Sequence, residues 1–222
     1  MHAEGGLPMF DRRLRGHLDG PLTRVAAVLD RRWITPDRLT VAGLVLGLAS
    51  AGLAASQLWL WALAAWWVSR LLDGLDGPLA RRRSADGQGS PAGGFLDVTA
   101  DFLVYGTTVV GVAIGTVGSA ADVGDWLPFA AVLLAYYVNG TAFLAFSSIA
   151  ERTGHQLDDG RSLSFLGGLA EGAETIAVHS LWLIVPAFAG PIAWVWAAVV
   201  GVSAAHRVVV GHRALRRPLA GP

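Results

Sequence analysis

Leu72 to Phe102 reads LDGLDGPLARRRSADGQGSPAGGFLDVTADF, and this stretch decides what the rest of the chain can be. Within otherwise apolar sequence it places four aspartates, which are Asp73, Asp76, Asp97 and Asp101. Residues three or four apart share one face of a helix, so each pair would point to one side. Carboxylates are costly inside a bilayer and persist there mainly at functional sites. The stretch therefore predicts a catalytic site on two neighbouring helices.

The composition indicates an integral membrane protein. Of the 222 residues 53% are hydrophobic and only 15% are charged, and the mean hydropathy is +0.48. The net charge is zero, which argues against a nucleic-acid partner. The chain has no cysteine, which excludes disulfides, thiol catalysis and iron–sulfur ligation.

Six segments have the length and apolar character to cross a bilayer, which takes about 20 residues. We expect them at about 39–57, 58–80, 94–118, 127–149, 165–188 and 191–210. The links on one side carry no arginine, whereas the links and termini on the other side are rich in it. The positive-inside rule then places both termini and the aspartates on the cytoplasmic side of the inner or plasma membrane. The expected fold class is all-α, a bundle of six transmembrane helices.

We divide the chain into a cytoplasmic juxtamembrane segment (1–35), a membrane domain (36–212) and a cytoplasmic tail (213–222). The first segment repeats apolar residues at steps of three or four, with arginines between them. These residues are Leu14, Leu18, Leu22, Val25 and Leu29. The pattern favours an amphipathic helix on the inner membrane face, with a flexible basic arm as the alternative. The segment lacks the apolar core of a signal peptide.

The residues around the aspartates suit phosphoryl transfer. Mg²⁺ and Mn²⁺ prefer carboxylate and phosphate oxygens, and two such ions can clamp a pyrophosphate. Gly77, Ala80 and Arg81 share a helix face with Asp73 and Asp76. The two small residues leave room for a nucleotide, and the guanidinium can bind a phosphate. We expect a reaction between an activated diphosphate and a lipid.

The pattern resembles the signature of the CDP-alcohol phosphotransferases (CDP-alcohol phosphatidyltransferases). The matching stretches are Asp73-Gly-Leu-Asp76-Gly77-Pro-Leu-Ala80-Arg81 and Gly93-Gly-Phe-Leu-Asp97-Val-Thr-Ala-Asp101, which agree at all eight fixed positions. The resemblance implies two divalent ions, Mg²⁺ or Mn²⁺, with Asp73 and Asp97 contacting both, Asp76 one and Asp101 the other. It also implies that Asp101 is the general base.

The resemblance further implies a binding site for the CDP-alcohol. Its residues would be Thr40, Asp73, Gly77, Ala80, Arg81, Ser90 and Gly93. Thr40 closes a segment that resembles the family's Pro-Asn-x-x-Thr, but Asp37 stands where asparagine is usual, which leaves the role of Asp37 open. Thr35 and Pro36 also read as an N-cap and a first helical proline.

Candidates for binding the acceptor lie later in the chain. They are Arg152, Arg161, Glu174 and Arg207. The alternative is that the arginines follow from topology or snorkel to the interface, and that Glu174 is a solvated interfacial residue, as we favour for Glu171. His179 reads as a packed, hydrogen-bonded histidine rather than a metal ligand. His206 is ambiguous between the cavity and the interface.

We therefore expect a membrane transferase of phospholipid biosynthesis that moves a substituted phosphate from a CDP-alcohol to a hydroxyl and releases CMP. The favoured donor is CDP-diacylglycerol, and the acceptor glycerol phosphate, another polyol phosphate or serine. The alternative is a soluble donor such as CDP-choline or CDP-ethanolamine. A divalent-cation transporter is a remote alternative, because transport sites usually lie near the membrane midplane.

Two further expectations concern the acceptor and the assembly. Relatives that use inositol phosphate tend to carry Ser-Tyr-x-Lys-Ala-Arg, whereas residues 147–152 read SSIAER, without the lysine. This counts against inositol phosphate as the acceptor. The resemblance implies a homodimer, and the small residues Gly43, Gly47 and Ser50 offer a face for close helix packing.

Overall fold

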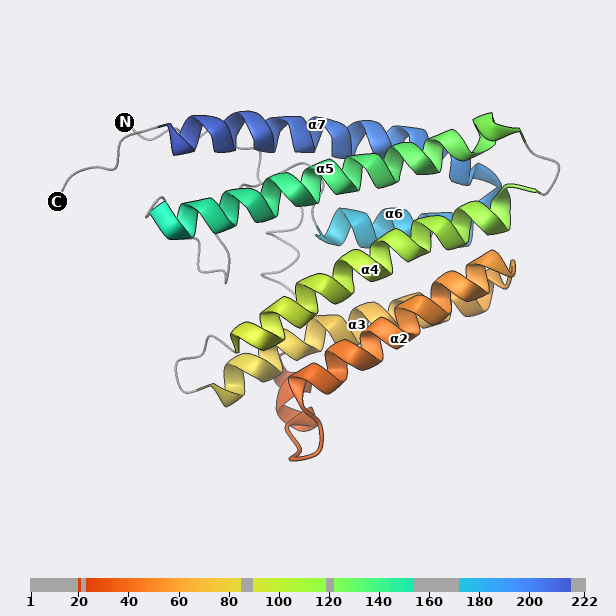
Figure 1. The fold of residues 1–222 in the computed structure, drawn as a ribbon. Coiled ribbons are helices and arrows are strands. Elements are labelled where there is room, and N and C mark those ends of the chain that lie inside the picture. The colour runs from red at the N-terminus through yellow and green to blue at the C-terminus, as the bar shows by residue number, and fades with distance from the viewer. Residues whose placement is uncertain (1–19, 21–22, 85–89, 119–121, 154–171, 217–222) are drawn as a thin grey trace. The chain divides into compact units, whose positions relative to one another are not determined.

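The computed structural model describes residues 20, 23–84, 90–118, 122–153 and 172–216, and every regular element within them is a helix. Residues 23–29 form a short helix. The later elements are α2 (Pro36–Ala55), α3 (Trp59–Arg83), α4 (Pro91–Thr116), α5 (Val123–Thr153), α6 (Gly172–Ile184), the 3-10 turn η1 (Pro186–Phe188) and α7 (Ala189–Leu215), as Figure 1 shows. The all-α expectation is confirmed.

Four of the described helical segments are long and apolar enough to cross a membrane. They are Pro36–Ala55, Pro91–Thr116, Val123–Thr153 and Pro186–Leu215. The second expected span corresponds to α3, which carries Arg70, the two aspartates and a basic end, and is therefore less apolar. The fifth expected span begins outside the described residues. The chain is thus a multi-pass membrane protein, and the number of six spans stays a prediction.

Two capping motifs set where helices begin. Thr35 is the N-cap of α2, its Oγ1 accepts from the Arg38 amide at 3.3 Å, and Pro36 follows as the first helical residue. The expected cap is confirmed. Ser90 and Pro91 repeat the arrangement at α4, where Ser90 Oγ accepts from the Gly93 amide at 2.9 Å. Because of these caps, both helices start three residues before the expected spans.

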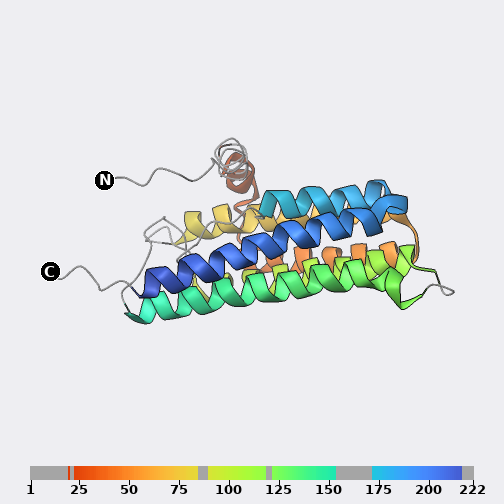
Figure 2. The same cartoon turned by 90° about the horizontal axis from the view of Figure 1, so that it is seen from above.

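The chain forms two compact units. The first contains α2, α3, α4 and α6, and the second contains α5 and α7. In the second unit α5 and α7 run side by side (Figure 2). Tyr136 Oη accepts from Trp196 Nε1 at 2.7 Å. All four aspartates belong to the first unit.

In the first unit α2 packs closely against both α3 and α4. A Cβ at Gly111 would overlap the backbone of Ala51, so only glycine permits this approach of α4 to α2. Ser50 Oγ and Ser69 Oγ join α2 to α3 by donating to backbone carbonyls across the contact, at 2.8 and 2.6 Å.

The small-residue face that we expected to support a dimer is used inside the chain. Gly43, Gly47 and Ser50 are buried in contacts with α3 and α4, where a Cβ at Gly47 would lie 2.5 Å from Val104. Close packing is therefore confirmed, but as intramolecular packing. The homodimer remains a prediction without this support.

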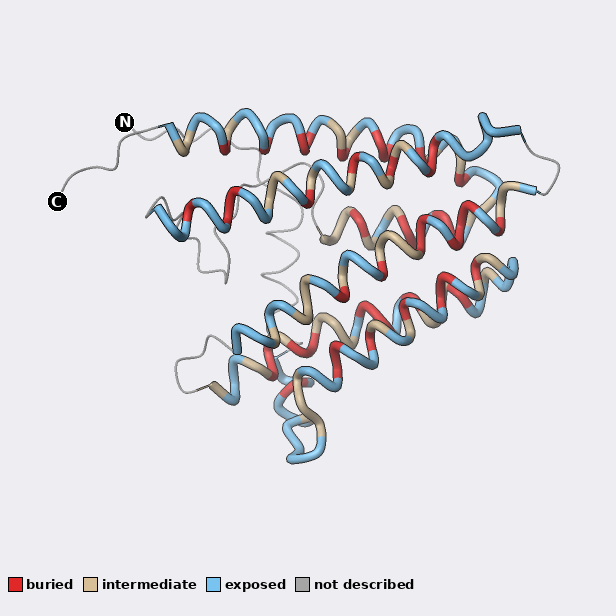
Figure 3. The backbone as a smooth tube through the Cα atoms, viewed as in Figure 1, coloured by how far each residue is buried: buried red, intermediate tan, exposed pale blue. Residues whose placement is uncertain are grey.

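Large apolar side chains remain exposed along the helices. Leu60, Val195 and Tyr137 are 75%, 67% and 73% exposed. Figure 3 shows exposed and buried positions alternating along each helix with the helical repeat. Exposed apolar side chains on long apolar helices suit contact with lipid.

The helix at residues 23–29 packs onto the first unit. Ala26 is fully buried beside Leu39, Leu75 and Leu79, and Leu29 packs against the same cluster. Val25 is 45% exposed, and Leu14, Leu18 and Leu22 lie outside the described residues. The described part is helical as expected, and its packing face is turned toward α2 and α3.

Candidate active site

The four aspartates stand on two helices of one unit. Asp73 and Asp76 come from α3, and Asp97 and Asp101 from α4. They lie close enough for the charges of the other three to act on Asp73. Asp76 is 6% exposed, while the side chains of Asp73 and Asp101 are 23% and 33% exposed. The two halves of the motif therefore lie near each other, and the roles assigned to the four aspartates stay predictions.

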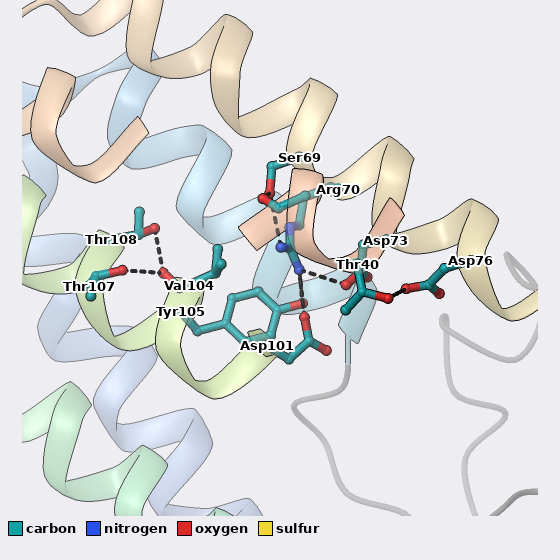
Figure 4. A network of polar contacts seen from close by, with 11 residues as sticks. Thr40, Ser69, Arg70, Asp73, Asp76, Asp101, Val104, Tyr105, Thr107 and Thr108 are labelled. Atoms are coloured by element: carbon teal, nitrogen blue, oxygen red, sulfur yellow. Dashed lines mark hydrogen bonds and ion pairs between the residues drawn. The ribbon is translucent and has the colours of Figure 1, made fainter. Parts of the chain in front are cut away.

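A buried arginine bridges the two halves. Arg70 Nη1 donates to Asp101 Oδ1 at 2.6 Å and lies 3.6 Å from Asp73 Oδ1 (Figure 4). Its side chain is 4% exposed. The guanidinium therefore balances carboxylates on α3 and α4 at once, and a buried charge needs such partners.

The other side of Arg70 is enclosed by aromatic rings and a hydroxyl. Its guanidinium carbon lies 5.3 Å from the ring centroid of Trp66 and 5.2 Å from that of Tyr105. Nη2 donates to Ser69 Oγ at 3.0 Å. Cation–π contacts of this kind hold a guanidinium in place.

The aromatic group extends to α6. His179 is fully buried and stacks on Trp66, with ring centroids 5.0 Å apart, and its centroid lies 4.8 Å from that of Trp182. The expectation of a packed histidine is confirmed. Arg70 itself was missed from the sequence. The available signal was a charge inside an apolar run, three residues before Asp73 on the same helix face.

Asp76 is oriented by α2. The Thr40 hydroxyl donates to Asp76 Oδ2, and both residues are buried, at 5% and 6% exposed. Pro36 O, at 3.2 Å from Thr40 Oγ1, is an alternative acceptor for the same proton. In the structure Thr40 therefore acts on the site through Asp76.

The expected donor-binding residues form two small groups. On α3, a Cβ at Gly77 would lie 3.4 Å from Arg81 Nη1, so the guanidinium folds back beside the glycine. At the start of α4, a Cβ at Gly93 would lie 3.0 Å from Ser90 Oγ and 3.4 Å from Asp37 Oδ1. The expected neighbours thus lie together within each group, and Asp37 stands beside the second. Ala80 is half-buried on the Gly77 helix, and Pro78 lies inside that helix.

The four carboxylates have the ligand chemistry that divalent cations require. Hard oxygen ligands are what Mg²⁺ and Mn²⁺ prefer, and four neighbouring negative charges call for cations. Within the described ranges, however, no three acidic, histidine or cysteine side chains are gathered in a geometry ready for a metal ion. Two of the carboxylates, Asp73 and Asp101, lie instead beside the Arg70 guanidinium.

The acceptor candidates are spread over both units. Glu174 lies in the first turn of α6, half-buried. Arg152 is exposed on α5, and Arg207 on α7 is 5% exposed with its guanidinium carbon 5.7 Å from the Phe143 ring. His206 is exposed. Arg161 and Glu171 lie outside the described residues, so an acceptor pocket stays a prediction.

Comparison with known families explains this constellation. The family model of CDP-alcohol phosphatidyltransferases matches residues 33–203, which include the whole motif. The chain belongs to this family. It is therefore a membrane-embedded transferase of substituted phosphate groups in phospholipid synthesis, as the resemblance implied.

Two curated relatives fit the assignment. Inner membrane protein YnjF of Escherichia coli is 37% identical over 212 residues, covering 94% of this chain and 98% of that protein. Archaetidylinositol phosphate synthase of Pyrococcus horikoshii is 36% identical over 103 residues, which cover 46% of this chain and 53% of that protein.

Solved structures share the fold. The phosphatidylinositol phosphate synthase of Mycobacterium tuberculosis with CDP-DAG bound has a TM-score of 0.70 and 22% identity, covering 89% of this chain and 98% of that one. The same enzyme in complex with manganese and citrate has a TM-score of 0.69 at the same identity, over 89% of this chain and 93% of that one.

Proposed function

We propose that this protein transfers the phosphatidyl group of CDP-diacylglycerol to a hydroxyl of a polyol phosphate and releases CMP. The observation that carries the proposal is the approach of the two motif halves, in which Arg70 bridges Asp73 on α3 and Asp101 on α4. The fold shared with a synthase solved with CDP-DAG supports the choice of donor.

Two divalent ions, Mg²⁺ or Mn²⁺, would be held by the aspartates. Asp73 and Asp97 would contact both ions, Asp76 the first and Asp101 the second. When bound, the ions supply positive charge to the diphosphate and to the leaving phosphate. The manganese complex of the mycobacterial synthase supports this assignment.

The protein's own residues perform the remaining steps. The acceptor hydroxyl oxygen attacks the β-phosphorus of the donor, and its proton passes to a carboxylate oxygen of Asp101, whose side chain is 33% exposed. The bond from this phosphorus to the bridging oxygen breaks, and CMP leaves. Arg81 and Gly77 would hold the CDP phosphates, and Ser90 and Gly93 would border the nucleotide at the α4 N-terminus.

The finer features of the proposal come from the sequence. The arginine distribution supports a cytoplasmic active site and cytoplasmic termini. Arg152, Arg161, Glu174 and Arg207 are the candidates for the acceptor pocket, and the family resemblance supports a homodimer. Two of the similar proteins are by name synthases of inositol phosphate lipids. Residues 147–152 of this chain lack the lysine, so glycerol phosphate and other polyol phosphates are the first acceptors to test.

The experiment is CMP release by the purified protein in lipid nanodiscs, with lipid products identified by mass spectrometry. CDP-diacylglycerol is compared with CDP-choline and CDP-ethanolamine, each against a panel of polyol phosphates and serine. We expect turnover with CDP-diacylglycerol only, dependent on Mg²⁺ or Mn²⁺ and abolished by excess chelator. Turnover with a soluble CDP-alcohol would favour the alternative donor, and full activity in chelator would exclude the metal-dependent mechanism.

A further inference from the structure

Arg70 places a positive charge of the protein itself beside carboxylates that would bind divalent cations. Its Nη1 is 2.6 Å from Asp101 Oδ1 and 3.6 Å from Asp73 Oδ1. These two aspartates come from different helices and are both assigned to divalent ions in the proposed function. We propose that Arg70 is a positioning residue whose charge holds Asp73 and Asp101 together and, at the same time, opposes the binding of a divalent ion to Asp101.

The opposition follows from the contact itself. Asp101 Oδ1 accepts a charge-assisted hydrogen bond from Arg70, so a metal ion that ligates Asp101 shares this carboxylate with a fixed positive charge. Mg²⁺ binds oxygen at about 2.0–2.1 Å, closer than a guanidinium nitrogen can stand. A dication bound to Asp101 would therefore lie close to the guanidinium, and the two positive charges repel each other.

The surroundings of Arg70 fix its charge in this place. Its side chain is 4% exposed and contacts Ser69, Trp66 and Tyr105. Trp66 is in turn stacked on the buried His179 of α6. Arg70 thus stays in place as a positive charge beside the proposed ion site.

The size of the effect can be estimated from Coulomb's law. A unit charge about 6 Å from a divalent ion weakens ion binding by a factor of about 10 even at the dielectric constant of water, and by more in a buried site. Removing the charge should therefore tighten metal binding. It should also destabilise the metal-free protein, because the buried carboxylates lose their counter-charge.

The test measures Mn²⁺ binding by electron paramagnetic resonance, and Tm in chelator, on the full chain in nanodiscs. Arg70→Gln and Arg70→Met remove the charge, and Arg70→Lys keeps it. The matched control is Arg83→Gln, on the same helix but paired with Asp30 at 2.7 Å. We expect the Gln and Met variants to bind Mn²⁺ at least about tenfold more tightly than the wild type, yet to melt lower in chelator. The Lys and Arg83 variants should bind within a few-fold of the wild type.

A merely structural arginine would give losses of both metal affinity and Tm, so the opposite signs are diagnostic. Unchanged or weaker Mn²⁺ binding by the folded Gln and Met variants overturns the inference. Because metal should replace the missing charge, failure of both variants to fold in saturating Mn²⁺ overturns it as well. This inference rests on the proposed function, and a wild type that binds no Mn²⁺ would instead reject the metal assignment itself.

Discussion

Replacing Thr40 by valine keeps the shape of the side chain and removes the hydroxyl that donates to Asp76. Both residues are buried, so water does not readily take the place of the donor. A hydrogen bond to a charged group contributes about 1.5–3 kcal/mol. At about 1.4 kcal/mol per factor of ten, the lost bond corresponds to about a 10- to 150-fold change in an equilibrium that depends on Asp76.

We expect Thr40→Val to weaken Mn²⁺ binding by about 10- to 100-fold, as substitutions behind a metal ligand commonly do. The assay is an Mn²⁺ titration together with the metal dependence of CMP release. Thr40→Ser keeps the hydroxyl and should stay within a few-fold of the wild type. Thr116→Val is the matched control, because its hydroxyl donates to Val112 O within α4. Wild-type metal affinity in Thr40→Val would show that Thr40 does not position Asp76.

Two further pairs of substitutions test the chemistry and the packing separately. Asp101→Asn should retain much of the CDP-alcohol affinity and lose about 10²- to 10⁴-fold in turnover. Asp73→Asn should lose affinity and turnover together. Near-normal turnover in Asp101→Asn would show that Asp101 is not the base. Gly111→Ala should lower the free energy of unfolding by about 1–3 kcal/mol, because its Cβ meets the Ala51 backbone. Gly52→Ala, where nothing lies within 4 Å of the added Cβ, should be neutral or stabilising by up to about 1 kcal/mol. Equal melting of the two glycine variants would contradict the packing argument.

The parts of the fold that depend on local sequence could be predicted. Apolar run length located the helices, and Thr35 with Pro36 marked a helix start, because capping involves only neighbouring residues. The aspartate spacing predicted one face on each helix for the same reason. The matching motif at Ser90 and Pro91 was equally readable in these terms.

Contacts between distant residues could not be predicted in the same way. The partners of Arg70 come from α3 and α4, and one of its aromatic neighbours stacks on a histidine of α6. No local sequence pattern predicts these contacts. The small residues of α2 illustrate the same limit. Gly43 and Gly47 predict a close helix contact, but whether the contact lies within the chain or between copies depends on the tertiary fold.

Pro78 lies inside the helix that carries the first two aspartates. Proline has no amide hydrogen, so the carbonyl of Gly74, four residues earlier, lacks its usual helical hydrogen bond. That carbonyl belongs to the same helical turn as Asp73 and Asp76. The backbone between the two carboxylates is therefore held by one bond fewer than the rest of α3, and small changes in its pitch cost less there. The proposed metal ligands Asp73 and Asp76 are thus presented by backbone whose pitch can adjust, while the aromatic packing one turn below keeps the rest of the helix fixed.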